Sequence, residues 1–239
     1  MRMRKKKNGS RRLLACGALF AFPLKAGAAT LADADLPGTI EPSMFEITPT
    51  APGKLLGRAE YPRYALEIGC GKGAFVRGMA RRAPDCGFIA MERVADVLTI
   101  AMEHAAAEQL PNARFILGDA GALDEYFPPH AFDVIYLNFS DPWPKRDQLE
   151  RRLTYRAYLE IYRRHLAPGG CIAFKTDNAA LFEFSKKEFK ACGFGLSAVT
   201  DDLHGPEWAG WAAERDVQTE YEAMWAARGA KIHRLEARG

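Results

Sequence analysis

The amino-acid sequence predicts an α/β fold with a mostly parallel sheet and helices on both faces. Short apolar runs typical of buried strands alternate with longer stretches of helical periodicity, and this alternation is typical of βαβ units. Five runs lie at residues 64–68, 87–91, 113–117, 132–137 and 171–174. Gly193-Phe194 opens a sixth strand, and residues 231–235 supply a last, antiparallel edge strand. The sequence therefore predicts seven strands.

Proline and glycine mark where the expected helices end. Pro84 ends the first helix, Pro111 follows the second, and Pro168-Gly169-Gly170 separates a later helix from its strand. Proline ends helices because it lacks an N–H and its ring clashes with the preceding turn. A final helix is expected over residues 219–227. No internal repeat is visible, so a chain of 239 residues indicates one well-buried domain with an appendage.

The charge is distributed unevenly along the chain. Lys and Arg total 33 and Asp and Glu total 30, but the first 25 residues hold eight of the bases and no acid. The remainder has 25 bases against 30 acids, a net charge of −5. We expect a basic N-terminal arm and poorly structured lead-in over residues 1–62, and a globular domain over residues 63–239. A polyanionic partner would need this arm or a local basic patch, although a solvated tail is the alternative.

The N-terminal region also bears on the cellular compartment. An apolar run at residues 13–22 follows basic residues and precedes small residues at 26–28, which resembles a weak secretory signal. The run is shorter than the ~20 residues that span a bilayer, so no membrane association is expected. The five cysteines are odd in number and do not form a disulfide framework. Buried, reduced thiols are typical of the cytoplasm, which is the location we expect.

Acidic residues lie at or just beyond the ends of four expected strands, where ligands of open α/β sheets bind. They are Glu67, Glu92, Asp119 and Asp141. Glu67 precedes a turn containing Gly69 and Gly71, whose missing Cβ atoms let a ligand approach the backbone. Singly, each acid has a structural interpretation as a helix cap or an ion-pair partner. Jointly they favour a ligand that carries adenosine, with Glu92 on the ribose hydroxyls and Asp119 on the adenine amino group.

The negative charge of these acidic residues distinguishes between two classes of cofactor. The glycine-rich turn also fits the dinucleotide fingerprint G-x-G-x-x-G/A, which by itself is ambiguous. Several carboxylates around the site would repel a pyrophosphate and attract a sulfonium. The acids therefore point away from NAD and toward S-adenosylmethionine.

Four further blocks resemble the bacterial tRNA (guanine-N7-)-methyltransferases, a family with the Rossmann-like class I methyltransferase fold. In order, they are Tyr136-Leu137-Asn138-Phe139-Ser140-Asp141-Pro142-Trp143-Pro144-Lys145, Arg151-Arg152-Leu153-Thr154, Phe174-Lys175-Thr176-Asp177-Asn178, and Thr219-Glu220-Tyr221-Glu222 followed by Ile232-His233-Arg234-Leu235-Glu236. The resemblance implies methyl transfer from S-adenosylmethionine to N7 of a guanine in the variable loop of tRNA. It leaves a monomer and a homodimer both open.

The resemblance also implies roles for individual residues. Asp141 would be the catalytic residue and would contact the cofactor together with Glu67, Glu92 and Asp119. The implied substrate-binding residues are Lys145, Asp177, Thr219, Glu220, Tyr221 and Glu222. Arg151 and Arg152 would contact RNA. No metal site is expected, because the five histidines are widely spaced and none has a cysteine partner in ligand register.

One segment departs from the family pattern. The family carries a dense basic run after the position of Lys145, whereas this chain has Asp147 and Glu150 there. Each lost phosphate contact lowers RNA affinity and flattens its salt dependence. Two alternatives therefore stay open: a methyltransferase of this fold acting on another RNA or a small molecule, and a non-catalytic tRNA-binding partner.

Overall fold

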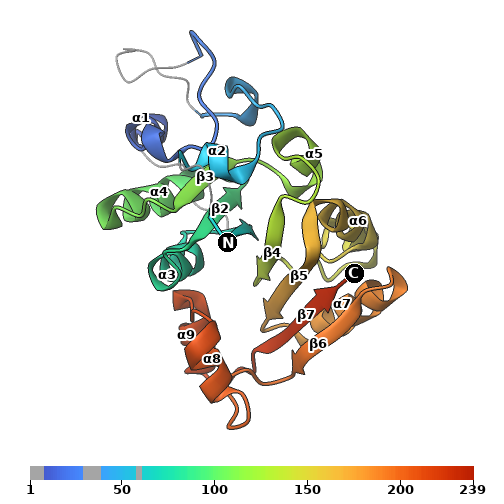
Figure 1. Ribbon diagram of the computed structural model, residues 1–239. Helices are drawn as coiled ribbons and strands as arrows, with labels where there is room; N and C mark the ends of the chain where they lie inside the picture. Colours follow the sequence, from blue (N-terminus) through green and yellow to red (C-terminus); the bar gives the residue numbers. More distant parts are fainter. Residues whose placement is uncertain (1–7, 29–38, 58–60) are drawn as a thin grey trace.

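The computed structural model describes residues 8–28, 39–57 and 61–239, and in them a seven-stranded sheet has helices on both sides (Figure 1). The strands follow the spatial order β3-β2-β1-β4-β5-β7-β6. Their bounds are β1 (Arg63–Ile68), β2 (Cys86–Glu92), β3 (Ala113–Leu117), β4 (Phe132–Asn138), β5 (Leu166–Thr176), β6 (Gly195–Thr200) and β7 (His233–Arg238). Strands β1 to β5 pair in parallel, and β7 is antiparallel to both of its neighbours. The expected fold class is confirmed.

Helices lie between the strands, as the alternation predicted. Within the described residues they are α1 (Gly9–Ala15), α2 (Pro52–Leu55), α3 (Ala74–Arg82), α4 (Ala95–Glu108), α5 (Leu123–Tyr126), α6 (Arg156–His165), α7 (Ala179–Ala191), α8 (Ala209–Arg215) and α9 (Glu220–Ala226). Helices α1 and α2 precede β1. Strand β5 begins directly after α6, so Pro168-Gly169-Gly170 lies within the strand and does not separate it from the helix as expected. Short 3₁₀ turns are η1 (Gly17–Leu19), η2 (Pro42–Met44), η3 (Ala120–Ala122) and η4 (Arg146–Arg151). Helix α9 matches the final expected helix, with Thr219 at its N-cap and Ala227 at its C-cap.

The last strand lies inside the sheet, and not at the edge where we expected it. β7 lies between β5 and β6, so the edge position belongs to β6, which pairs antiparallel with β7. The exposure of the two strands agrees with this order. Leu235 and Ala237 of β7 are fully buried, whereas β6 alternates between exposed and half-buried residues.

The direction of the chain reverses between β1 and β4. From β1 it runs outward through β2 to β3, and it then returns to β4 on the other side of β1. In open parallel sheets this reversal separates the connecting loops and leaves a crevice at the carboxyl ends of the two strands. The fold thus provides a ligand crevice beside the ends of β1 and β4.

The N-terminal region contains more packed structure than its sequence predicts. Leu13 of α1 and Ile40 are almost fully buried in the main hydrophobic core. Arg12 pairs with Glu103 of α4, with 2.7 Å between Nε and Oε1. Phe20 forms a parallel bridge with Phe115 of β3. The expected poorly structured lead-in is therefore folded over the described parts of residues 1–62, whereas its most basic part, residues 1–7, lies outside the described residues.

The apolar run at residues 13–22 is part of this packing. Its large side chains cover β3 and α4, because Phe20 and Phe22 are buried against the same core. Across residues 8–28, 39–57 and 61–239, no helix combines the length and apolar character needed to cross a bilayer.

A close contact joins α3 to the segment that connects α8 and α9. Gly78 of α3 faces Val217, and a Cβ built on Gly78 would lie 2.5 Å from Val217 Cγ1. Arg82, one turn further along α3, donates a hydrogen bond of 2.7 Å to the carbonyl of Asp216. The absence of a side chain at Gly78 therefore lets the segment at residues 216–217 lie directly on α3.

We expect Gly78→Ala to destabilise the protein, although alanine normally favours a helix by about 1 kcal/mol over glycine. The added methyl would displace Val217, and strain of this kind costs typically ~1–3 kcal/mol. Gly210→Ala in α8 is the matched control, because its Cβ would meet nothing within 4 Å. Thermal unfolding should show a lower Tm for the first variant and an equal or higher Tm for the second. An equal rise in Tm in both variants would contradict the close contact between Gly78 and Val217.

Candidate functional site

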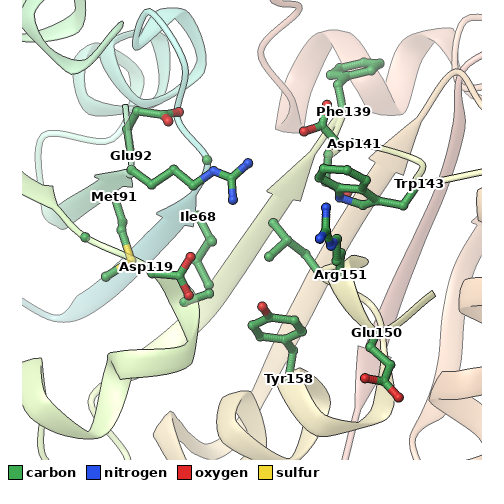
Figure 2. A pocket seen from close by; sticks show the side chains of 16 residues that line it. Ile68, Met91, Glu92, Asp119, Phe139, Asp141, Trp143, Glu150, Arg151 and Tyr158 are labelled. Atoms are coloured by element: carbon green, nitrogen blue, oxygen red, sulfur yellow. The ribbon is translucent and has the colours of Figure 1, made fainter. Parts of the chain in front are cut away.

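A cavity of about 480 Å³ opens at the carboxyl ends of β1 to β4 (Figure 2). Four residues expected to bind a cofactor line it: Gly69, Glu92, Asp119 and Asp141. Arg151, Trp143 and Tyr158 form part of its opposite wall. Glu67 does not line the cavity and lies buried behind it. The structure thus brings together three of the four strand-end acids around one space.

The glycine-rich turn after β1 is fastened to Glu92 of β2. Gly71 donates its N–H to Glu92 Oε2 at 3.1 Å, and the Val94 N–H lies 3.0 Å from Oε1. Gly71 has a φ of +58°, a left-handed conformation that glycine adopts without a Cβ penalty. The Glu92 carboxylate is therefore held by backbone donors, and each oxygen retains acceptor capacity for a ligand hydroxyl.

Asp119 has two roles in the geometry. Its Oδ1 accepts the Gly121 N–H at 2.9 Å, so Asp119 is the N-cap of η3. It also lines the cavity. The structural interpretation of this residue is correct, and it does not remove Asp119 from the site.

Glu67 is a buried carboxylate at the centre of the sheet. Asn138 Nδ2 donates to its Oε1 at 3.0 Å. Burial raises the pKa of Glu67 to about 7, although Asn138 and the Lys175 ammonium both act to lower it. Near neutral pH the Glu67 side chain is therefore a mixture of its protonated and ionised forms, and a cation nearby would favour the ionised form. This property fits a residue that stands behind the binding site of a sulfonium.

The loop from Phe139 to Pro144 carries Asp141 to the rim of the cavity. Phe139 and Trp143 have positive φ values of 52° and 38°, which are strained for residues with side chains. Arg152 holds this backbone, because its guanidinium donates to the carbonyls of Pro142 at 2.8 Å and of Trp143 at 3.1 Å. Asp141 itself is exposed to solvent. The loop thus presents its carboxylate on a fixed backbone.

The paired arginines that follow this loop separate in space. Arg151 lines the cavity, with its guanidinium carbon 5.0 Å from the centre of the Trp143 ring. Arg152 is only 7% exposed and lies over the Phe184 ring at 4.3 Å, and burial lowers its pKa. We expected both arginines to contact RNA. In the structure the donors of Arg152 are directed into the protein, because two loop carbonyls require them.

The residues expected to bind substrate also divide into two groups. Tyr221 donates its hydroxyl to Asp177 Oδ2 at 3.1 Å, and its ring packs 5.2 Å from that of Phe139. The Phe139 ring in turn lies near Asp141 at the cavity (Figure 2). Lys145 is exposed at the N-cap of η4 and does not line the cavity. The side chain of Glu220 is outside the described part of the structure.

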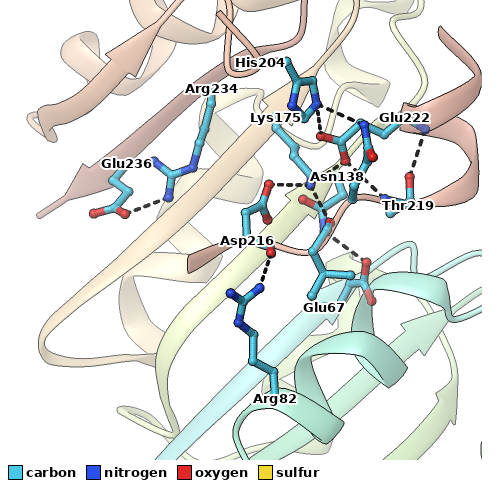
Figure 3. Close-up of polar contacts among 12 residues, drawn as sticks. Glu67, Arg82, Asn138, Lys175, His204, Asp216, Thr219, Glu222, Arg234 and Glu236 are labelled. Carbon is cyan, nitrogen blue, oxygen red and sulfur yellow. Dashed lines mark hydrogen bonds and ion pairs between the residues drawn. The ribbon is translucent and has the colours of Figure 1, made fainter. Parts of the chain in front are cut away.

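Thr219 and Glu222 are engaged inside the protein. They form a capping box, in which Thr219 Oγ1 accepts the Glu222 N–H at 3.1 Å and Glu222 Oε2 accepts the Thr219 N–H at 3.3 Å. Glu222 is fully buried and also pairs with Lys175 of β5, with 2.7 Å between Oε2 and Nζ (Figure 3). Sequence reasoning assigned no role to Lys175. A lysine at the buried end of a parallel strand was the available signal, because such a charge requires a partner.

No group of three or more His, Cys, Asp or Glu side chains in the described ranges is arranged to hold a metal ion. The donor set instead fits S-adenosylmethionine. Glu92 and Asp119 offer carboxylates for the ribose and adenine. Gly69 has no side chain and so leaves its backbone accessible to a ligand, and Asp141 adds negative charge at the rim. Those residues would hold the cofactor.

The pKa of Glu67 leads to a test of stability against pH. A carboxylate with a pKa near 7 in the folded state and 4.5 in the unfolded state binds its proton more tightly when folded, so stability falls as pH rises from about 4.5 to 7. The shift corresponds to roughly 3 kcal/mol. Glu67→Gln should remove most of this loss, measured as the free energy of urea unfolding at pH 5 and pH 8. Glu46→Gln, at an exposed site, is the control. An unchanged pH dependence in Glu67→Gln would contradict the assignment.

Comparison with known proteins points to one family. The family model described as "Putative methyltransferase" matches residues 62–235. The chain is 45% identical over 172 residues to a tRNA (guanine-N(7)-)-methyltransferase of Brevibacillus brevis, covering 72% of this chain and 78% of the relative. It is also 45% identical over 173 residues to the enzyme of that name from Lactococcus lactis subsp. cremoris, with the same coverage.

Solved structures support the fold. A 16S rRNA methyltransferase superposes with a TM-score of 0.57 at 15% identity, covering 83% of this chain and 96% of that one. An antibiotic-related methyltransferase gives a TM-score of 0.56 at 16% identity, covering 90% and 98%. At such low identity these two show the fold alone. Together, the matched family model, the extent of the similarity and the strand-end carboxylates establish that the chain belongs to the tRNA (guanine-N7-)-methyltransferase family.

Proposed function

We propose that this protein transfers a methyl group from S-adenosylmethionine to N7 of a guanine in tRNA. One observation carries the proposal: the cavity lined by Glu92, Asp119 and Asp141 also has Phe139 in its lining, and the Tyr221 ring packs against that of Phe139. The acids suit a cationic, adenosine-bearing cofactor, and the rings supply a surface on which a purine can stack. Cofactor and base would thus meet at Asp141.

The chemistry needs positioning more than proton transfer. When bound, S-adenosylmethionine supplies an electrophilic methyl group. Guanine N7 has an in-plane lone pair and no proton, so no general base is required and alignment of the two reactants provides the rate enhancement. Methylation leaves the base cationic, and the carboxylates of Asp141 and Asp177 would stabilise the developing positive charge.

Residues around Asp141 would select and hold the nucleotide. Asp177 can accept the N1–H or the amino group of guanine, and Tyr221 already donates to it. Lys145 and Arg151 are placed for phosphate, since Lys145 is exposed and Arg151 borders the cavity. The exposed acids Asp147 and Glu150 lie in the same turn, η4, and would weaken this contact. RNA binding therefore depends strongly on the remaining bases.

The protein would act in the cytoplasm. All five cysteines are free and four are buried, three of them in the main hydrophobic core. Unpaired thiols of this kind are typical of a reducing compartment, where tRNA is also found.

The direct test is to incubate the protein with labelled S-adenosylmethionine and bulk tRNA, digest the RNA and identify the modified nucleoside. We expect 7-methylguanosine. Asp141→Asn should lower kcat/KM by about 100-fold or more, because a preorganised charge at the reacting atoms is lost. Asp147→Asn, an exposed acid outside the cavity, should retain turnover. Label on another nucleoside, or only on a small molecule, would overturn the proposed substrate, and full activity of Asp141→Asn would overturn the role of Asp141.

The two arginines give a second test. Arg151→Gln should weaken tRNA binding and reduce the slope of log Kd against log salt by about one, as expected for one phosphate contact. Arg152→Gln should leave that slope unchanged and lower kcat, because the Pro142 and Trp143 carbonyls lose their donors. Fluorescence titrations at several salt concentrations and steady-state kinetics measure both. A salt slope reduced equally by the two variants would show that Arg152 contacts phosphate.

A further inference from the structure

Lys175 is a buried ammonium whose partners all come from one distant segment. Nζ lies 2.8 Å from Asp216 Oδ2, 3.0 Å from the Val217 carbonyl and 2.7 Å from Glu222 Oε2 (Figure 3). The residue is 2% exposed. Three acceptors match the three N–H donors of an ammonium, so this lysine has no donor left for a ligand.

Apart from the contact of Val217 with α3, the described side chains of the segment that Lys175 holds have few buried apolar contacts. The buried apolar cluster that includes Ala212 of α8 has only two further members, Leu203 and Ile232, among the described residues. In α9, Tyr221 is 44% exposed and Met224 is 42% exposed. Because few apolar contacts fix these helices, the buried ion pairs carry a larger share of their positioning.

The same contacts set the spacing of the proposed guanine-binding surface. Asp177 follows Lys175 by two residues at the end of β5, and Tyr221 directly precedes Glu222 in α9. The Tyr221 hydroxyl meets Asp177 at 3.1 Å only while β5 and α9 stay in this register. The pair between Lys175 and Glu222 therefore lies directly behind the pair between Asp177 and Tyr221.

Glu222 has no free acceptor facing the cavity. Its second oxygen, Oε1, lies 2.9 Å from His204 Nε2, while Oε2 receives Lys175 and the Thr219 N–H. It is fully buried and does not line the cavity. A substrate contact by this carboxylate would require the ion pair to open.

We propose that Lys175 is a positioning residue that holds α9 and its Tyr221 against the sheet, and that Glu222 is its counterion and not a contact to guanine. This inference rests on the proposed function for its kinetic consequence, but the placement of α9 can be measured without any activity.

The kinetic test is a double-mutant cycle with Lys175→Met, Glu222→Gln and the double variant, in the full chain. Lys175→Met should raise KM for tRNA at least about tenfold, because it leaves the fully buried Glu222 and the half-buried Asp216 without their cation. Adding Glu222→Gln to Lys175→Met should raise KM no further, since the pair is already broken. Lys186→Met is the matched control, because Lys186 pairs with Glu183 within α7 itself. Lys175→Arg should recover part of the loss.

Losses that multiply in the double variant would overturn the counterion assignment, because they would show an independent contact by Glu222. Hydrogen exchange tests the positioning role without any measurement of activity. In Lys175→Met, exchange should accelerate over residues 216–227 and remain unchanged in β2, and unchanged exchange over residues 216–227 would overturn the positioning role. If Lys175→Met does not fold, Glu222→Gln serves as the milder variant, since it leaves Asp216 paired with the ammonium. Exchange over residues 216–227 must still be faster in that variant than in the unaltered protein. Absence of methylation by the unaltered protein would refute the proposed function and leave the exchange result standing.

Discussion

The parallel register of β4 between β1 and β5 is the constraint on which the site depends. It pairs Ile68 with Leu137 and Asn138 with Lys175, so the ends of three strands meet at one level. Asn138 then reaches Glu67 of β1, and the Phe139 N–H bonds to the Lys175 carbonyl. A slip of one residue would turn every β4 side chain to the opposite face and remove these contacts together. The acids expected to bind the cofactor and the loop that carries Asp141 therefore depend on the same strand register.

Charge compensation is the second organising principle. Lys175 brings a buried cation between the acids of the segment at residues 216–222 and the carboxylate of Glu67, whose pKa it lowers. Burying charge is unfavourable unless each group is paired and hydrogen-bonded. Lys175 and Glu222 meet that condition, whereas Glu67 accepts a hydrogen bond from Asn138 at Oε1 and its Oε2 has no partner among the described residues. The arrangement links the two halves of the site electrostatically, so that the cation which orders α9 also favours the ionised form of Glu67.

The sequence predicted the parts of the protein that are encoded locally. Alternating apolar runs located the strands. The acids at strand ends predicted that Glu92, Asp119 and Asp141 lie together, and all three line one cavity, because the fold itself places such positions at one edge. Arg151 and Arg152 are indistinguishable as neighbours in sequence, and only tertiary packing turns one outward and one inward. The partners of Lys175 lie 41 to 47 residues away, beyond any local pattern. Tertiary contact also overrides the weak periodicity of the lead-in, where scattered side chains such as Leu13 and Ile40 are buried.

The bridge between Phe20 and Phe115 has a consequence for how the molecules behave in concentrated solution. An outer strand with unpaired amide and carbonyl groups can recruit the same strand from another molecule and begin aggregation. The Ala21 N–H occupies the Phe115 carbonyl, which blocks part of this border of the sheet. At the far border, β6 is short and is distorted between Ser197 and Thr200, with Ala198 in a left-handed conformation. Both outer strands are thus poor templates for intermolecular pairing.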